Sequence, residues 1–319
     1  MLLGTFNGRN FLEEQVESIF QQTFDQWVLL IRDDGSTDDT PKLLDQFRQG
    51  DPRIELLQDN LGRVGVVRNY GLLMEAAKER CPDVVFFADQ DDVWMPHKLT
   101  TQIEMIRNLE QAHSSEIPIL VYSDLSVVDE NLQVIHPSFM RLQNLIHEPV
   151  APLRTLLSQN LVTGCATAIN RSLLTVAIPV PEVAVMHDWW LALCAGAFGV
   201  VGYTSEPLLF YRQHSNNQIG APGWWNLFNV LSPTTRRRWR THSLVFAKTF
   251  QQARALYTRA VEHPHPSPWK DLIFQYANCV QRNRMRRVLD MMGSGVNRQG
   301  IMRKLIFYMR LLLLRADGY

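Results

Sequence analysis

The sequence predicts an α/β protein in which a mainly parallel sheet carries helices on both of its faces. Over the first two-thirds of the chain, short apolar runs rich in β-branched and aromatic residues alternate with longer segments of helical periodicity. Such alternation is typical of parallel strands joined by crossover helices. In addition, acidic clusters directly follow two of the apolar runs, and this is the edge at which such sheets bind ligands.

The elements can be placed in chain order. A short first strand at 1–3 is followed by strand candidates at 27–31, 54–57, 84–88, 120–122, 166–169 and 200–203. Helical patterns lie between them at 11–21, 39–48, 64–79 and 96–109. Ser36, Thr37 and Asp38 offer N-caps to the second helix, where Pro41 suits the first turn, and we interpret Asp38 and Asp39 as capping residues. The first strand is short for a buried parallel strand, so we expect the natural start to lie upstream.

The composition excludes several classes of protein. Of the 319 residues, 46% are hydrophobic and 20% are charged, which is too apolar for a disordered chain and ordinary for a globular one. No apolar run reaches the length of about 18 residues that predicts a membrane-spanning helix, and no signal peptide is indicated. The dispersed Cys81, Cys165, Cys194 and Cys279 predict reduced thiols in a cytosolic protein.

The formal net charge of zero conceals two regions of opposite sign. Residues 1–233 hold 15 Lys and Arg against 28 Asp and Glu, whereas residues 234–319 hold 17 against 4. Because strand signals stop there, we expect an α/β domain at 1–231 and a helical basic region at 232–319. The basic region suits peripheral contact with the anionic inner face of the cytoplasmic membrane. The alternative is a bundle packed on the acidic domain or on a second subunit, as in a homodimer. No nucleic-acid partner is expected.

Carboxylates gather after two of the predicted strands. Asp33 and Asp34 end one apolar run, and Asp89, Asp91 and Asp92 follow another. Carboxylates crowded at one sheet edge repel one another unless a cation compensates, and Mg²⁺ or Mn²⁺ accepts carboxylate and phosphate oxygens as ligands. In an extended chain Asp89 and Asp91 point the same way and could share one metal–nucleotide complex. The alternative, that the aspartates only form turns, stays open.

Four motifs follow one another with compatible spacing in roughly the first 220 residues. They are Thr5-Phe6-Asn7-Gly8, Asp33-Asp34-Gly35-Ser36-Thr37-Asp38, Asn60-Leu61-Gly62 with Gly65-Val66-Val67-Arg68-Asn69, and Asp89-Gln90-Asp91-Asp92. Together they resemble glycosyltransferase family 2, whose enzymes have the GT-A fold. The resemblance implies a nucleotide-sugar part at about 1–125 and an acceptor part at about 126–231. The Gln-x-x-Arg-Trp motif of processive synthases is absent, which argues against polymerisation.

The resemblance implies transfer of a sugar from a nucleotide-sugar donor to a hydroxyl group, with inversion at the anomeric carbon. The implied nucleotide-binding residues are Thr5, Asn7, Asp33, Asp34, Gly62, Arg68 and Asp89. Asp33 would accept from the base and Asp89 from a ribose hydroxyl, while Arg68 would contact the diphosphate or pair with Asp59. Asp91, with Asp89, would hold the metal ion, Mg²⁺ or Mn²⁺.

A fifth element, His187-Asp188-Trp189-Trp190, resembles the segment that carries the catalytic carboxylate in a rhamnosyltransferase-like subgroup. The resemblance makes Asp188 the general base, with helix capping as the alternative. One of Trp189 and Trp190 would pack in the core, and the other would stack on a sugar; His187 would only pack. The donor implied is dTDP-rhamnose, and the acceptor is a lipid-linked or growing surface glycan.

The segment at 211–217 is also similar to that subgroup. There His214 would complete the metal shell or lie at the surface as a hydrogen-bonding residue, since neutral imidazole suits Mn²⁺ better than Mg²⁺. Arg212 would pair with phosphate near the acceptor and sugar.

Two rival functions make different predictions. A sugar-1-phosphate nucleotidyltransferase would carry a Gly-rich basic loop over the triphosphate, which residues 4–8 lack, and it would release pyrophosphate instead of a nucleoside diphosphate. A non-catalytic, membrane- or nucleic-acid-associated basic module would bind no nucleotide, and the intact acidic motifs argue against it.

Overall fold

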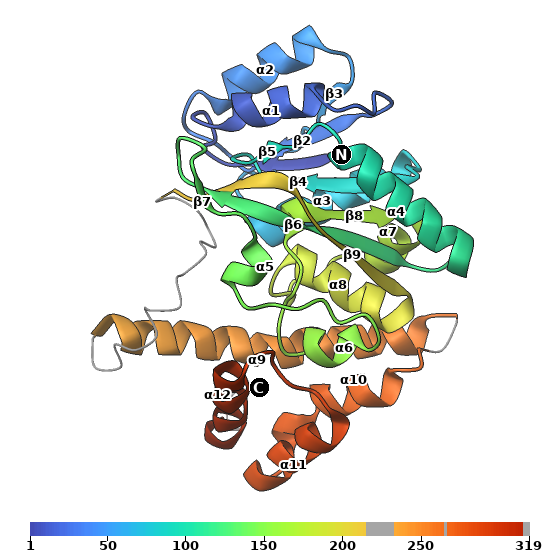
Figure 1. Cartoon of the computed structure of the whole chain (residues 1–319), viewed down its shortest axis with the longest axis vertical. Coiled ribbons are helices and arrows are strands. Elements are labelled where there is room, and N and C mark those ends of the chain that lie inside the picture. Colours follow the sequence, from blue (N-terminus) through green and yellow to red (C-terminus); the bar gives the residue numbers. More distant parts are fainter. Residues whose placement is uncertain (215–232, 265–266, 315–319) are drawn as a thin grey trace.

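One sheet of nine strands organises the described chain, which in this computed structural model comprises residues 1–214, 233–264 and 267–314, with side chains described outside 233–242. The strand order is β3-β2-β1-β4-β8-β6-β9-β5, and β7 pairs with β6 (Figure 1). The strands are β1 (Leu2–Thr5), β2 (Leu29–Asp33), β3 (Ile54–Leu56), β4 (Val84–Ala88), β5 (Val93–Trp94), β6 (Ile119–Val128), β7 (Val134–His136), β8 (Thr167–Asn170) and β9 (Val200–Arg212). The helices among them are α1 (Leu12–Phe20), α2 (Thr40–Gly50), α3 (Val66–Glu79), α4 (Lys98–His113), α5 (Phe139–Leu142), α6 (Pro152–Leu156), η1 (Gly164–Ala166), α7 (Arg171–Ala177) and α8 (His187–Phe198).

The amino-terminal half of the sheet has the predicted form. β1 lies between β2 and β4, β3 flanks β2, and all of these neighbours run parallel. α1, α2 and α3 connect them and begin and end close to their predicted bounds. The carboxyl ends of these strands therefore meet at one edge of the sheet, as we predicted from the acidic clusters that follow them.

The second half of the sheet is mixed rather than parallel. β8 runs antiparallel to β4 and to β6, β9 runs parallel to β6, and β5 runs antiparallel to β9. The prediction of an α/β fold is confirmed, but a mainly parallel sheet describes only the first half. Short helices and irregular loops lead into β8, and such connections give no periodic signal from which strand direction can be predicted.

β6 and β9 are much longer than the apolar runs that predicted them. β6 continues past residue 122 because the side chains of Asp124 and Ser126 are buried and hydrogen-bonded. The Ser138 hydroxyl donates to Asp124 Oδ2 at 2.5 Å, and the Met140 N–H donates to Asp124 Oδ1 at 3.1 Å. A buried, satisfied polar residue interrupts an apolar pattern without ending the strand.

Strand side chains point alternately into two cores, one on each face of the sheet. Leu2 and Leu30 contribute to the core that includes residues of α3, α7, α8 and α9. Leu3 and Ile31, their sequence neighbours, contribute to the core that includes residues of α1, α2 and α4. This alternation follows from the two-residue period of a strand and explains why helices cover both faces.

The carboxyl-terminal region is helical, as predicted, and consists of α9 (Pro233–Glu262), α10 (Lys270–Ala277), η3 (Cys279–Gln281), α11 (Arg284–Ser294) and α12 (Ile301–Leu313). α9 crosses the molecule between the α/β part and α10 to α12 (Figure 1). Phe246, Phe250 and Leu256 of α9 are buried in the same core as α8. The domain boundary near residue 231 stays a prediction, and the side chains of the basic run at 236–240 lie outside those described. No described helix has the length and apolar character needed to cross a bilayer.

Candidate active site

Side chains fasten together the loops that follow β1, β2 and β4. The hydroxyl of Thr5, which ends β1, donates to Gln90 Oε1 in the loop after β4 at 2.7 Å. The N–H of Asn7 donates to Ser36 Oγ in the loop after β2 at 2.7 Å, and Asn7 Oδ1 accepts from the N–H of Thr37 at 2.8 Å. The structure thus brings together the opening turn and both acidic motifs at one edge of the sheet.

The contacts of Gln90 and Gly8 show how closely the opening turn approaches the loop after β4. Gln90 Oε1 also accepts from the N–H of Phe6 at 2.8 Å, and Gln90 Nε2 donates to the Phe6 carbonyl at 3.2 Å. A Cβ atom on Gly8 would come within 2.4 Å of Gln90 Oε1, so a side chain at this position would displace the Gln90 amide from its contacts with Thr5 and Phe6. Gln90 holds the opening turn against the second acidic motif, a role that its residue type did not predict.

A buried cation holds the segment that carries Gly62. The Arg32 guanidinium is almost fully buried and donates to Asp34 at 3.0 Å and to the two oxygens of Asp59 at 2.7 and 3.0 Å. It also donates to the Gly62 carbonyl at 3.0 Å. Asp34 accepts from two backbone N–H groups just before α3 at 2.7 and 2.9 Å. The hydrogen bonds from Arg32 hold the pKa of Asp59 below its ordinary value.

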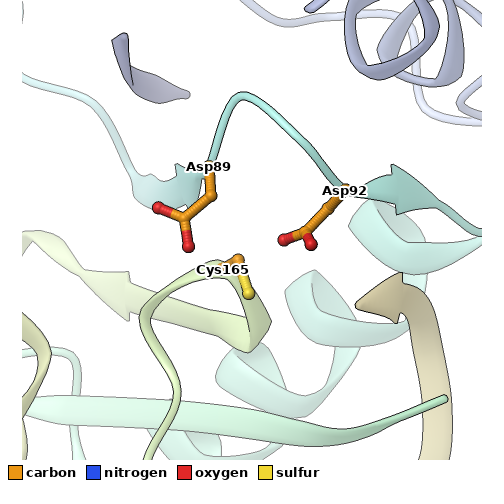
Figure 2. A group of neighbouring side chains, drawn as sticks. All are labelled: Asp89, Asp92 and Cys165. Atoms are coloured by element: carbon orange, nitrogen blue, oxygen red, sulfur yellow. The ribbon is translucent and has the colours of Figure 1, made fainter. Parts of the chain in front are cut away.

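Figure 2 shows the second acidic motif, with Asp89 at the end of β4, Asp92 leading into β5 and Cys165 of η1 between them. These three side chains offer ligand atoms that all lie within 4.8 Å of one another. Burial, with a contribution from the charge of Asp91, raises the pKa of Asp89 to about 6. Burial also raises the pKa of Asp92 well above its ordinary value. The electrostatics of this loop therefore favour a cation.

Asp91 pairs with His214, just beyond the end of β9. Residues 90 and 91 form a turn, so the chain from Asp89 to Asp91 is not the extended segment that the prediction assumed, and a metal site shared by the two carboxylates stays a prediction. Asp91 Oδ2 lies 2.8 Å from His214 Nε2, and both side chains are largely buried. A carboxylate beside an imidazole is a donor pair that suits Mn²⁺ and, less well, Mg²⁺.

Asp188 lies in the first turn of α8, where three groups donate to its carboxylate. The N–H of Trp189 donates to Oδ1 at 2.5 Å, the N–H of Gly164 to Oδ2 at 3.0 Å, and Asn160 Nδ2 to Oδ1 at 3.2 Å. Burial raises the pKa of Asp188 to about 7; the charge of Asp89 adds to the rise, while the three hydrogen bonds oppose it. A buried carboxylate that titrates near neutral pH is suited to accept a proton.

His187, the residue before Asp188, packs against a tyrosine that contacts Asp89. Its ring stacks on Tyr70 with 3.9 Å between centroids, and the Tyr70 hydroxyl donates to Asp89 Oδ1 at 2.9 Å. Neither ring nitrogen has a hydrogen-bond partner among the described residues, and burial lowers the pKa of His187 to about 3, so the ring is neutral. Tyr70 therefore links Asp89 to His187, the residue that precedes Asp188 in the chain.

Comparison with known proteins shows to which family the chain belongs. The model of glycosyl transferase family 2 matches residues 2–143. The chain is also 30% identical over 224 residues to TuaG of Bacillus subtilis, provisionally named a teichuronic acid biosynthesis glycosyltransferase, with 69% of this chain and 80% of TuaG covered. The chain belongs to glycosyl transferase family 2.

A further relative is similar in sequence, and two solved structures are similar in fold. The chain is 26% identical over 229 residues to the dTDP-rhamnosyl transferase RfbG of Shigella flexneri, covering 69% of this chain and 74% of RfbG. Its fold is similar to that of TarS from S. aureus, with a TM-score of 0.55, 13% identity, and 92% and 78% of the two chains covered. The mannosyltransferase PcManGT from Pyrobaculum calidifontis gives a TM-score of 0.52, 15% identity, and 92% and 72% coverage. The expected GT-A fold is confirmed.

Both tryptophans of the segment at 187–190 are interior residues. Trp190 has no exposed surface, and its indole N–H donates to the Ala177 carbonyl at 2.7 Å. Trp189 is 6% exposed, and its indole N–H donates to the Leu156 carbonyl at 2.6 Å. The structure therefore corrects the expectation that one of them forms a sugar-stacking platform. The indole N–H of each tryptophan donates to a backbone carbonyl in the core. Such a partner cannot be predicted from the residue type alone.

Arg212 is likewise a structural residue. It is 1% exposed and donates to the Asp91 carbonyl at 2.9 Å and to the Glu130 carbonyl at 2.5 Å, and it pairs with Glu14 of α1. These contacts correct the expectation that Arg212 pairs with phosphate near the acceptor. They fix the loop that carries Asp91 against the last strand.

Arg68 does not make the alternative pair that the sequence left open. Asp59 is held by Arg32, while the ion pair of Arg68 is with Glu75 at 3.7 Å, on a side chain that is about half exposed. Contact of Arg68 with a diphosphate stays a prediction. So do the nucleotide contacts of the other residues gathered at this edge, which are Thr5, Asn7, Asp33, Asp34, Gly62 and Asp89.

Sequence reasoning missed the residues that hold the predicted ones in place. Asn160 and Gly164 lie in an irregular segment with no periodicity and no motif, so nothing in the sequence pointed to their contact with Asp188. Tyr70 lies within α3, where its position fits an ordinary core residue. Each became visible only when the fold brought distant segments together.

A hollow of about 1540 Å³ lies at the opposite edge of the sheet, near the amino ends of the strands. It is lined among others by Val28, Val84 and Ile117, and it contains none of the predicted site residues. Ligands of such folds bind at the carboxyl ends of strands, so we place the active site at the acidic edge.

Proposed function

We propose that this family-2 glycosyltransferase is an inverting, metal-dependent enzyme that transfers L-rhamnose from dTDP-rhamnose to a hydroxyl of a surface glycan or its lipid-linked precursor. The observation that carries the inverting mechanism is the environment of Asp188: a buried carboxylate, raised in pKa and aimed by three hydrogen bonds, close to the acidic edge. Inversion by direct displacement needs one such base near the donor site.

Asp188 would take the proton of the acceptor hydroxyl as the acceptor oxygen bonds to the anomeric carbon. The bond from that carbon to the diphosphate oxygen breaks, and the nucleoside diphosphate leaves from the opposite side of the sugar. Oδ1 already accepts two hydrogen bonds whereas Oδ2 accepts one, so Oδ2 keeps more room for the incoming proton. General-base assistance of this kind contributes about 10²- to 10⁴-fold to the rate.

The residues at the acidic edge fit a divalent cation. Asp91 and His214 offer an oxygen and a nitrogen donor, and the raised pKa of Asp89 indicates that the loop favours positive charge. These residues, with Asp89, would hold Mg²⁺ or Mn²⁺, and the bound ion would neutralise the charge that develops on the leaving diphosphate. PcManGT, of the same fold, has been solved with GDP-mannose and Mn²⁺.

The donor and the pathway rest on relatives. RfbG is named a dTDP-rhamnosyl transferase and shares 26% identity with this chain, and TuaG is assigned to teichuronic acid biosynthesis. These names support rhamnose as donor sugar and surface polysaccharide synthesis as the process. A panel of nucleotide-sugars, scored by release of nucleoside diphosphate, tests both; release of pyrophosphate would instead indicate a nucleotidyltransferase.

Asp188→Asn is the decisive variant. We expect the transfer rate to fall by about 10²- to 10⁴-fold while the affinity for the nucleotide, measured by calorimetry with Mn²⁺, changes little. Thr175→Ala, an exposed threonine on α7, is a matched control. A wild-type rate for Asp188→Asn would remove Asp188 from the mechanism.

A further inference from the structure

α12 presents apolar side chains on the side that faces solvent. Ile301, Leu305 and Leu313 are 80%, 58% and 60% exposed, and Met302 and Met309 are also exposed. At about 100° per residue these five side chains occupy one continuous side of the helix. The opposite side carries Phe307, Arg310 and Leu311, which are buried. α12 therefore has one apolar side packed in the protein and a second one in contact with water.

α11 repeats the arrangement. Met285, Leu289 and Met292 are exposed and follow one another at helical spacing, while Arg287 and Met291 on the other side are buried. α11 and α12 both lie on the side of α9 that faces away from the sheet (Figure 1). We call the exposed set the α11–α12 apolar face: Met285, Leu289, Met292, Ile301, Met302, Leu305, Met309 and Leu313. Large patches of exposed apolar side chains commonly mark a surface that contacts another protein or a membrane.

Basic residues accompany this apolar face. Arg282, Arg284 and Lys304 are exposed, and Arg286, also exposed, pairs with Asp290 at 2.9 Å. Between residues 270 and 314 the sequence holds nine Lys and Arg against two acidic residues, Asp271 and Asp290. Apolar side chains beside an excess of positive charge are complementary to a bilayer interface that contains anionic lipids.

The same charges disfavour a second copy of the chain as the occupant. A symmetric dimer would bring the same patch of each protomer together, so the exposed cations on α11 and α12 would face their own copies. Like charges placed opposite one another in an interface cost free energy. α9 buries its apolar side against the α/β part, in the core that also includes Met291 of α11 and Phe307 and Leu311 of α12, so packing on the protein accounts for the buried sides of these helices and not for their exposed apolar sides.

We propose that the α11–α12 apolar face docks on anionic lipid bilayers, with the exposed Ile, Leu and Met side chains entering the interface and the surrounding Arg and Lys side chains contacting headgroups. The proposal does not depend on the donor or on the reaction. It does place the enzyme at the surface where a lipid-linked acceptor would be found.

Vesicle flotation of the full-length protein tests this directly. The probe is phosphatidylcholine vesicles with and without about a third of phosphatidylglycerol, at low and high salt. We expect binding to the anionic vesicles only, weaker at high salt. The triple variant Ile301→Ser, Leu305→Ser, Met309→Ser should reduce the bound fraction at least tenfold. A matched triple variant at exposed apolar positions elsewhere, Val134→Ser, Ile135→Ser and Val150→Ser, should bind like wild type.

Each contrary result has a definite meaning. Thermal melting first establishes that both triple variants remain folded. Absence of wild-type binding to anionic vesicles at low salt, or equal binding by wild type and the α12 variant, would overturn the proposal. Sedimentation would overturn it as well if wild type formed a dimer that the α12 variant lost, because the face would then be a contact between copies. Neither readout uses the transferase reaction, so both are independent of the proposed function.

Discussion

Asn160→Ala should move the pH dependence of transfer to higher pH. Asn160 Nδ2 donates to Asp188 Oδ1 at 3.2 Å, and this bond stabilises the ionised carboxylate. A hydrogen bond to a charged group is worth about 1.5 to 3 kcal/mol, and about 1.4 kcal/mol corresponds to one pKa unit. The bond is long, and Oδ1 keeps its bond from the Trp189 N–H, so we take the lower end and expect a rise of about one unit from the wild-type value of about 7.

The sign follows from the role of the base. In its proposed role as general base Asp188 works only when deprotonated, so a higher pKa would lower the rate near pH 7 by about fivefold and leave it nearly unchanged at pH 9. The assay is nucleoside diphosphate release at saturating substrate between pH 5.5 and 9, with Asn131→Ala, on an exposed turn, as the control. A loss of rate that is equal at every pH would show that Asn160 only supports the fold. An unchanged profile would show that its bond to Asp188 has no effect on the base.

Two further variants probe the proposed metal site at Asp91 and the buried cation of Arg32. Asp91→Asn should lower nucleotide affinity in Mn²⁺ at least tenfold, to the value that wild type shows in EDTA; calorimetry that finds full metal-dependent affinity in the variant would exclude Asp91 as a ligand. Arg32→Met should destabilise the protein by about 3 to 5 kcal/mol, since it leaves the buried Asp34 carboxylate without its cation. Urea denaturation measures this, and Arg48→Met, in an exposed pair with Asp45, should change stability by less than about 1 kcal/mol.

The sequence predicted those features that depend on residue type and on nearby positions in the chain. The strand at Val84–Ala88 was predicted with its observed bounds, because an uninterrupted apolar run ends directly at a carboxylate. The loops that follow β1, β2 and β4 meet because parallel strands bring their carboxyl ends to one edge, which is a property of the fold class alone. Asp188 was found only through resemblance, since one aspartate before two tryptophans has no distinctive physical signature.

The failures share a physical cause. Arg212 and one of the two tryptophans were expected to contact ligand because their side chains can bind phosphates and sugars. The same donors bind carbonyl groups equally well, and burial decides which partner they meet. Burial depends on segments distant in sequence: α1 supplies Glu14 to Arg212, and α6 supplies the Leu156 carbonyl to Trp189. Donor chemistry could be predicted from the sequence, whereas the partner could not.

The pairing of β9 with β6 affects where Asp188 lies relative to the pair formed by Asp91 and His214. From Val200 to Arg212 the chain takes twelve steps, while the paired residues Ile119 to Val128 are only nine steps apart, with the register shifts near Asp124. An odd excess of residues reverses which side of the strand each later side chain faces. Deleting a single residue from this stretch would therefore turn the end of β9, and His214 beyond it, away from Asp91, while Asp188 in the preceding helix stayed in place. The placement of Asp188 relative to the loop of Asp91 therefore depends on the number of residues in β9, which neither motif reveals by itself.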